Sequence, residues 1–252
     1  MAENDQFKVK IWGSRGSYPK PGKNTIRYGG NTACVEVLIG NCHTIFDAGT
    51  GIIELGQELF SRMQGTDTPL LVNLFITHTH YDHIEGLPFF KPAYCKSSVI
   101  HIFGPRSESG DLYNTIAQTM YPPYFPVKFS ELMSSRSIYE VSDASRIDLC
   151  AVEGKPVPSD GTPSDHIVVD VLLGSNHPDQ IAIYAVSWKG KRMVFATDTE
   201  GVEGGDERLI SFARGADLLI HDAHFTRAAY TDPHHPKKGW GHSTVDMAVE
   251  VA

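Results

Sequence analysis

Apolar residues come in short runs separated by turn residues through the first half of the chain. Runs rich in branched and aromatic residues, typical of strands, lie at 8–11, 33–39, 43–47 and 70–76. A Gly-Asn pair at 40–41 predicts a hairpin between the second and third runs. Apolar residues at 52, 53, 55, 59, 60 and 63 recur with helical spacing. We therefore predict a helix over 50–63, with Thr50 as its cap.

The second half repeats this alternation of strands and helices. Further strands are predicted at 98–104, 166–174, 181–188, 191–198 and 216–222, and helices at 111–120, near 206–213 and from Thr244 onwards. The Pro- and Gly-containing stretches at 19–22, 121–126 and 154–163 are short, which favours loops over domain linkers. The order of elements predicts an α/β fold with two packed sheets covered by helices.

Composition adds limits to this interpretation. With 252 residues and 41% apolar content, the chain can form one domain with a substantial core. No run of about 18 apolar residues predicts a membrane span, and the N-terminus lacks the pattern of a signal peptide. The cysteines have no metal or disulfide spacing, so we expect reduced, buried thiols and a cytoplasmic protein; they are Cys34, Cys42, Cys95 and Cys150.

The net charge of −8 argues against a long polyanion wrapped around the whole surface. A local basic patch is still compatible with this charge. Lys20, Lys23 and Arg27 cluster near the start of the chain, and Lys237 and Lys238 lie near its end.

The segment THTHYDH concentrates metal-ligand side chains directly after the run at 70–76. Alternate residues of an extended segment point the same way, so His78 and His80 can converge on one ion. Asp82 and His83 can converge on a second ion. Imidazole and carboxylate groups suit zinc, manganese or iron rather than calcium. The alternative is a surface loop that is merely rich in histidine.

Two more residues stand where a two-metal site would need them. His177 lies in a turn before the strand at 181–188, and Asp198 follows the strand at 191–198. Each alone is ordinary turn chemistry. Together with the cluster they become the expected remaining ligands, and a carboxylate such as Asp198 can bridge ions held ~3.5–4 Å apart.

At this point a family resemblance can be named. FDAGTG at 46–51, THTHYDH at 77–83, NHP at 176–178, TDT at 197–199 and GHST at 241–244 occur in the order found in metallo-β-lactamase-fold hydrolases. DHIEGLPFF, ADLLIHDAHF and GHST resemble the phosphodiesterase branch, which includes tRNase Z and bacterial cyclic-nucleotide phosphodiesterases. The resemblance implies an αββα four-layer sandwich over 1–252 as a single domain, with two divalent metal ions, zinc or manganese, or iron.

The same resemblance implies a role for each matching residue. One ion would be held by His78, His80, His177 and Asp198, and the second by Asp82, His83 and Asp198. Asp47, His221 and Asp222 would support the ligands, and His242 would protonate the leaving oxygen. Simpler interpretations exist: Asp47 as a turn residue, His221 as a satisfied strand-end histidine, and Ser243 or Thr244 as the cap of the last helix.

In one respect the sequence departs from the branch, which has another metal-binding histidine on a final strand. Here the sequence stops at Ala252, and no histidine follows His242. We therefore expect a domain that lacks its final strand. Alternatively, the second ion binds weakly, or another histidine replaces the ligand: His224, His234, His235 or His242.

The resemblance, with these residues in place, implies a metal-dependent phosphodiesterase in which Asp82 orients the nucleophile and His242 is the general acid. The expected substrate is a small phosphodiester such as a 3′,5′-cyclic nucleotide, whose base the aromatic stretch 121–129 could stack against, if it is not simply core. A tRNase Z-like ribonuclease is the alternative, although no glycine- and proline-flanked basic arm for tRNA is evident. A thioesterase or lactonase, and a binding protein without turnover, are the others. Homodimers are common in the branch; no membrane partner is expected.

Overall fold

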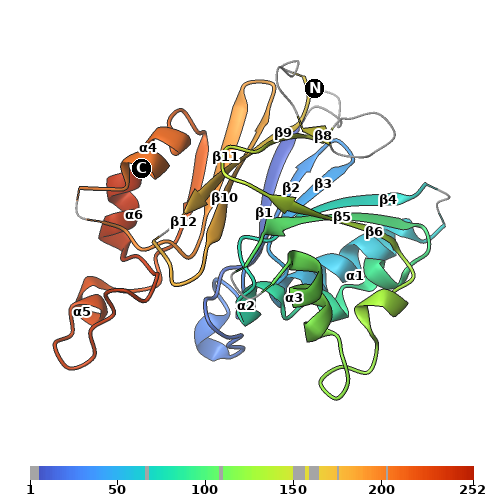
Figure 1. Ribbon diagram of the computed structural model, residues 1–252, viewed down its shortest axis with the longest axis horizontal. Coiled ribbons are helices and arrows are strands. Elements are labelled where there is room, and N and C mark those ends of the chain that lie inside the picture. Colours follow the sequence, from blue (N-terminus) through green and yellow to red (C-terminus); the bar gives the residue numbers. More distant parts are fainter. Residues whose placement is uncertain are drawn as a thin grey trace. The chain divides into compact units, whose positions relative to one another are not determined.

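The computed structural model describes residues 6–65, 68–107, 110–149, 157–158, 165–174, 176–202 and 204–252. The chain divides into two compact units, Met1–Glu140 and Val141–Ala252. Each unit is built around a six-stranded sheet with its own helices (Figure 1). The single domain expected over 1–252 stays a prediction, and each unit is described by itself.

The sheet of the first unit follows the order of the chain. Its strands are β1 (Phe7–Gly13), β2 (Cys34–Ile39), β3 (Cys42–Phe46), β4 (Leu70–Phe75), β5 (Ser98–Pro105) and β6 (Ser135–Val141). The first three strands pair antiparallel, with the predicted hairpin between β2 and β3. From β3 to β5 the pairing is parallel. Parallel neighbours end at the same edge of a sheet, and this edge carries the histidine cluster.

Helices cover this sheet through their apolar sides. The described helices of the unit are α1 (Gly51–Met63), α2 (Tyr81–Ile84) and α3 (Leu112–Thr119), with short 3-10 turns η1 (Lys23–Thr25), η2 (Leu87–Phe89), η3 (Lys91–Tyr94) and η4 (Phe129–Glu131). Ile52, Leu55 and Leu59 of α1 join the core cluster that contains Leu74 and Ile102 of the sheet. The apolar spacing read from the sequence is therefore the buried face of α1.

One predicted detail of α1 is wrong. Thr50 stands at the N-cap position but makes no capping hydrogen bond. Its hydroxyl instead accepts a hydrogen bond from the backbone N–H of Thr32 at 2.9 Å. A threonine hydroxyl can bond to a nearby loop instead of to the first turn of its helix. Here the hydroxyl of Thr50 bonds to Thr32 of the neighbouring loop.

The second unit has the strand order β12-β11-β10-β9-β7-β8. The strands are β7 (Arg146–Asp148), β8 (Val157–Pro158), β9 (Val168–Gly174), β10 (Ile181–Trp188), β11 (Lys191–Ala196) and β12 (Leu218–His221). β11 and β12 run parallel, and β9, β10 and β11 pair antiparallel. The helices are α4 (Glu207–Ala213), α5 (Arg227–Tyr230) and α6 (Val245–Val251). Leu209 of α4 and Val251 of α6 pack against Ile183 and Val194 of the sheet.

Most predicted elements are observed within a few residues of their predicted ends. The sequence did not predict β6, β7, β8, α2 or α5, which are short or have mixed polarity. The stretch 154–163, predicted as a loop, lies outside the described residues except at 157–158. No helix in the described part of the chain is long and apolar enough to cross a membrane.

The cysteines follow the prediction only in part. Cys34, Cys42 and Cys95 are reduced thiols, as expected, but only Cys34 is buried. Burial, with the charges of Asp47 and Glu36, raises the pKa of the Cys34 thiol. Cys42 and Cys95 are half-exposed, which corrects the expectation of burial, and Cys150 lies outside the described residues.

Candidate metal-binding site

In the first unit, parallel pairing brings Asp47 beside the histidine cluster. Phe46 at the end of β3 pairs with Phe75 at the end of β4, so the residues that follow both strands meet at one edge. The N–H of Asp47 continues the ladder by donating to the carbonyl of Phe75 at 2.8 Å. Asp47 is fully buried and has a left-handed backbone with φ of 62°. Non-glycine residues rarely adopt this conformation, and Asp is among those that tolerate it.

The Asp47 carboxylate holds the segment that follows β4. It accepts hydrogen bonds from the backbone N–H of Thr77 at 2.8 Å and from the Thr77 hydroxyl at 3.0 Å. It also lies 2.7 Å from Nδ1 of His83. Burial raises the pKa of Asp47, and His83 and Thr77 oppose that shift. With Nδ1 of His83 paired to Asp47, Nε2 of the same ring faces Asp82 at 3.5 Å. A carboxylate that fixes the histidine ring in this way is typical of metal sites.

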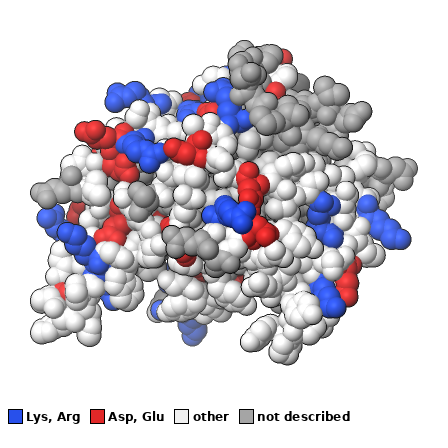
Figure 2. Space-filling view, in the orientation of Figure 1, with Lys and Arg blue, Asp and Glu red and all other residues white. Residues whose placement is uncertain are grey.

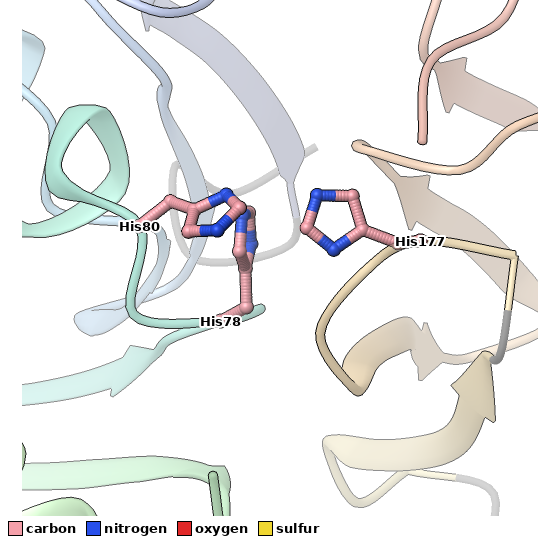
Figure 3. A group of neighbouring side chains, drawn as sticks. All are labelled: His78, His80 and His177. Carbon is pink, nitrogen blue, oxygen red and sulfur yellow. The ribbon is translucent and has the colours of Figure 1, made fainter. Parts of the chain in front are cut away.

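The imidazoles of this unit are gathered together. The ring of His78 lies 4.5 Å from that of His80 and 4.3 Å from that of His83, centre to centre. Figure 3 shows His78 and His80 next to each other on the segment after β4. His78, Asp82 and His83 are buried, whereas His80 is exposed. The Asp82 carboxylate accepts a hydrogen bond from the N–H of Ser17 at 2.7 Å, a contact from the β1–β2 loop that no sequence pattern indicated.

In the second unit, the parallel strands β11 and β12 place an aspartate at the sheet edge in the same way. Ala196 pairs with His221 at the ends of these parallel strands, and the N–H of Asp222 donates to the carbonyl of Ala196 at 2.9 Å. This register places Asp222 near Asp198, which is buried and left-handed with φ of 51°. His242 arrives from the segment before α6. Asp198, Asp222 and His242 each offer one ligand atom, and these atoms lie within 4.8 Å of one another.

His177 stands in the same unit, in the turn before β10 (Figure 3). The N–H of Asp179 donates to its Nδ1 at 3.2 Å. The ring centres of His177 and His242 are 6.3 Å apart. Gly241, with φ of 83°, makes this proximity feasible, because a Cβ there would lie 2.3 Å from Cδ2 of His177. The chain needs glycine at this position both for its backbone and for the approach of the ring.

Four other histidines singled out from the sequence lie in the second unit, in three different settings. The ring of His224 stacks on that of His242 at 4.4 Å, and the backbone N–H of His224 donates to the Asp222 carboxylate at 2.8 Å. His234 and His235 lie exposed after α5. His221 ends β12 with Nδ1 2.7 Å from the carbonyl of Asp222. Its buried Nε2 has no hydrogen-bond partner within the described residues, and it does not join the group of Asp198, Asp222 and His242.

Both sets of side chains fit a divalent metal ion. Each unit presents carboxylate oxygens and imidazole nitrogens close together, which is the donor set of zinc, manganese and iron sites. Asp47 orients His83 in one unit and Asp222 orients His242 in the other, at 2.7 and 2.9 Å. Asp222, predicted as a supporting residue, also offers an oxygen to the group of possible ligands.

Several contacts around these residues lay beyond sequence reasoning. Ser243 donates to the carbonyl of Thr199 at 2.6 Å and accepts from the N–H of Gly201 at 2.9 Å. Thr244, one of the two expected caps, does cap α6 by accepting from the N–H of Met247 at 3.3 Å. The two bonds of Ser243 join residues 44 and 42 positions apart, which no spacing indicates, whereas the Thr244 cap is local and was expected.

The aromatic stretch 121–129 is packed into the core only in part. Phe129 is buried, and Phe125 packs against the core cluster of the first unit. Tyr121 and Tyr124 are exposed by 55% and 88%. Core packing therefore accounts for the phenylalanines but not for the tyrosines.

Comparison with known proteins extends these findings. The model of the family described as "Beta-lactamase superfamily domain" matches residues 43–252. A ribonuclease Z of Thermoplasma acidophilum is 26% identical over 283 residues, an alignment that covers 100% of this chain and 83% of that protein. The expected resemblance to the phosphodiesterase branch is thereby confirmed.

Solved structures agree on the fold. The short form of human tRNase Z matches with a TM-score of 0.62 and 23% identity, covering 97% of this chain and 87% of that one. A diphosphatase of the PhnP family matches with a TM-score of 0.63 and 15% identity, covering 98% and 82%. The predicted α/β fold of the metallo-β-lactamase type, with two sheets and their helices, is confirmed.

Proposed function

This chain belongs to the β-lactamase superfamily and is a metal-dependent hydrolase, and from that premise we propose that it cleaves phosphodiester bonds. The observation that carries the proposal is the pair of Asp222 and His242 beside Asp198. In this arrangement His242, a possible proton donor, stands beside Asp198, a carboxylate that can bind metal. Departure of an alkoxide from phosphorus requires such a donor. The relatives are named ribonuclease Z, and cleavage of RNA is cleavage of a phosphodiester bond, which supports the same reaction class.

The proposed metal ligands are those expected from the sequence. His78, His80, His177 and Asp198 would hold one ion, and Asp82, His83 and Asp198 the other, as zinc, manganese or iron. Bound divalent ions supply activated water and offset the negative charge of the phosphate. The proposal draws on both units. It is supported by the family, by the group of Asp198, Asp222 and His242 in the second unit, and by the gathered imidazoles of the first.

The chain's own residues would perform the other steps. The Asp82 carboxylate, held by the N–H of Ser17, would orient the attacking water. Nδ1 of His242 is hydrogen-bonded to the carboxylate of Asp222. The proton for the departing oxygen would therefore come from Nε2 of that ring, the role of a general acid.

A small phosphodiester such as a 3′,5′-cyclic nucleotide is the first proposed substrate. The exposed rings of Tyr121 and Tyr124 support it, since exposed aromatics can stack on a base. On the face drawn in Figure 2, basic and acidic side chains are interspersed, and no large area of one sign is seen among the described residues. Such a face gives a long polyanion no continuous track.

Cleavage of RNA is the second candidate, favoured by the named relatives and by the β1–β2 loop. Lys20, Lys23 and Arg27 are exposed on this loop, and the guanidinium of Arg27 lies 5.0 Å from the ring of the exposed Tyr28. The same loop contacts Asp82 through Ser17. Cations and an exposed ring on a loop that also contacts the proposed catalytic carboxylate suit a nucleotide chain.

One experiment tests both candidates. The protein, loaded with zinc or manganese, is given cyclic AMP, cyclic GMP and a precursor tRNA with a 3′ trailer. A simple thioester and a lactone serve as controls, and the His80→Ala variant reports contaminating activity. Conversion of a cyclic nucleotide to a monophosphate supports the first candidate, and release of the trailer supports the second. Turnover of only the thioester or lactone would refute phosphodiester cleavage.

A further inference from the structure

Glu200 lies two residues beyond Asp198, and its carboxylate accepts hydrogen bonds from three groups. It accepts a hydrogen bond from the Tyr230 hydroxyl at 2.5 Å. The N–H of Gly239 lies 2.8 and 2.9 Å from its two oxygens. The N–H of Gly241 donates to it at 2.9 Å. Hydrogen bonds to an ionised acceptor are stronger than neutral ones.

The backbone around Glu200 adds further links inside the second unit. The N–H of Glu200 donates to the carbonyl of Asn176, the residue before His177, at 2.9 Å. Its neighbours Thr199 and Gly201 both bond to the hydroxyl of Ser243, the residue after His242. Glu200 therefore stands where the segments that carry Asp198, His177 and His242 meet.

The segment 237–241 is built to face this carboxylate. Gly239 and Gly241 have φ of 85° and 83°, and this left-handed backbone, which glycine adopts readily, turns both N–H groups toward Glu200. Trp240 between them is 55% exposed, and the ammonium of Lys237 lies 3.9 Å from its ring. The exposed side chains do not anchor the segment in the unit. One backbone bond does, from the N–H of Lys237 to the carbonyl of Tyr230 at 3.2 Å, and the N–H groups of Gly239 and Gly241 add the bonds to Glu200. Burial and Glu200 raise the pKa of Tyr230 to about 12, so its hydroxyl stays a donor.

We propose that Glu200 is a positioning residue that clamps segment 237–241 and so sets where His242 stands relative to Asp198 and His177. The clamp itself rests on contacts within the second unit, and its effect on proton donation rests on the proposed function. The clamp also borders a pocket of about 560 Å³, lined by His177, Pro178, Tyr230 and Met247 among others. Release of the segment would therefore change both the proton donor and the wall beside it.

The clamp is tested first without any activity. Glu200→Ala and Glu200→Gln are compared with Glu250→Gln, which makes the same charge change at an exposed position of α6. Trypsin cleavage after Lys237 and Lys238 reports the order of the segment. Fluorine NMR of 5-fluorotryptophan protein, with Trp240→Phe for assignment, reports Trp240 apart from Trp12 and Trp188. We expect cleavage to quicken at least about 10-fold in Glu200→Ala, with only the Trp240 signal moving.

The conservative variant separates clamping from folding. The amide introduced by Glu200→Gln would keep one carbonyl oxygen as an acceptor, so this variant should fall between wild type and Glu200→Ala in both measurements. Glu250→Gln should match wild type. Wild-type cleavage rates and an unmoved Trp240 signal in Glu200→Ala would overturn the clamp. So would equal changes at all three tryptophans, because these would indicate general unfolding.

The catalytic consequence is tested with two phosphodiesters that differ only in leaving group. Loss of a positioned acid should matter for an alkoxide and little for p-nitrophenolate, which needs no proton. We expect kcat of Glu200→Ala to fall at least about 10²-fold for the alkyl diester, with unchanged metal content. Equal loss for both diesters would overturn the positioning of His242. If wild type cleaves neither diester, the proposed function fails, while proteolysis and fluorine NMR still decide the clamp.

Discussion

Nδ1 of His242 lies 2.9 Å from the carboxylate of Asp222 and 3.7 Å from that of Asp198. The nearer carboxylate fixes the orientation of the ring, and the farther one places the ring beside a proposed metal ligand. Both acids are buried and both follow strands of a parallel pair. The ring of His242 is therefore tied to the ends of the sheet through these two contacts, although His242 itself comes from a loop.

His242→Ala should slow cleavage of an alkyl phosphodiester by roughly 10²–10⁴-fold, because the leaving oxygen loses its proton donor. Metal content should be unchanged, as measured by elemental analysis of the dialysed protein. His235→Ala, which removes an exposed histidine of the same unit, is the control. Loss of metal from His242→Ala would instead identify His242 as a ligand.

His80→Ala should lower bound metal, because an imidazole donor is removed from the group formed with His78. His80 is exposed, so the substitution leaves the core of the first unit intact. Metal per chain and the circular dichroism spectrum should be measured on the same sample. His234→Ala, at another exposed histidine, is the matched control. Full metal content in His80→Ala would remove His80 from the ligand set.

Asp47→Asn should weaken metal binding by about 10–100-fold, because His83 loses the charged partner that orients it. Asparagine tolerates a left-handed backbone, so the change isolates the loss of charge from backbone strain. Metal titration followed by the shift of the melting temperature gives the affinity. An unchanged titration would show that Asp47 supports only the turn after β3.

Gly241→Ala and Gly239→Ala form a matched pair. Both glycines are left-handed, so alanine should cost each variant about 1–2 kcal/mol. Only at Gly241 would the new Cβ meet another residue, at 2.3 Å from the ring of His177; at Gly239 nothing lies within 4 Å. Gly241→Ala should therefore lose metal and turnover beyond its loss of stability. Equal behaviour of the two variants in metal titration and kinetics would contradict the packing of His177 against Gly241.

The sequence predicted those parts of the site that depend on strand ends. Asp47, His78, Asp198 and Asp222 each lie within three residues of the end of a strand that the apolar pattern indicated. Parallel neighbours end at one edge, so their pairing could be expected once the fold was named. The polar spacing of the cluster itself, with histidines at 78, 80 and 83, indicated the metal ligands.

The links that hold these residues were not predictable in the same way. Ser17 to Asp82 spans 65 positions, and Gly239 to Glu200 spans 39. Such contacts depend on how the loops pack over the sheet, and loop packing produces no repeating pattern of residue types in the sequence. The hydrogen bond of the Thr50 hydroxyl was unpredictable for the same reason, because it is made with Thr32 of a nearby loop and not with the helix that Thr50 precedes.

In each unit, the parallel ladder extends one hydrogen bond past the strand, from Asp47 to Phe75 and from Asp222 to Ala196. The two aspartates are thus tied through their amides to strand pairs, inside the sheet of the first unit and at its edge pair β11–β12 in the second, although they are outside the strands. Deuterium should enter these amides only when the strands themselves separate. Slow exchange would then mark the two aspartates that orient His83 and His242, so that a rigid backbone would hold the rings around which metal and substrate are proposed to bind.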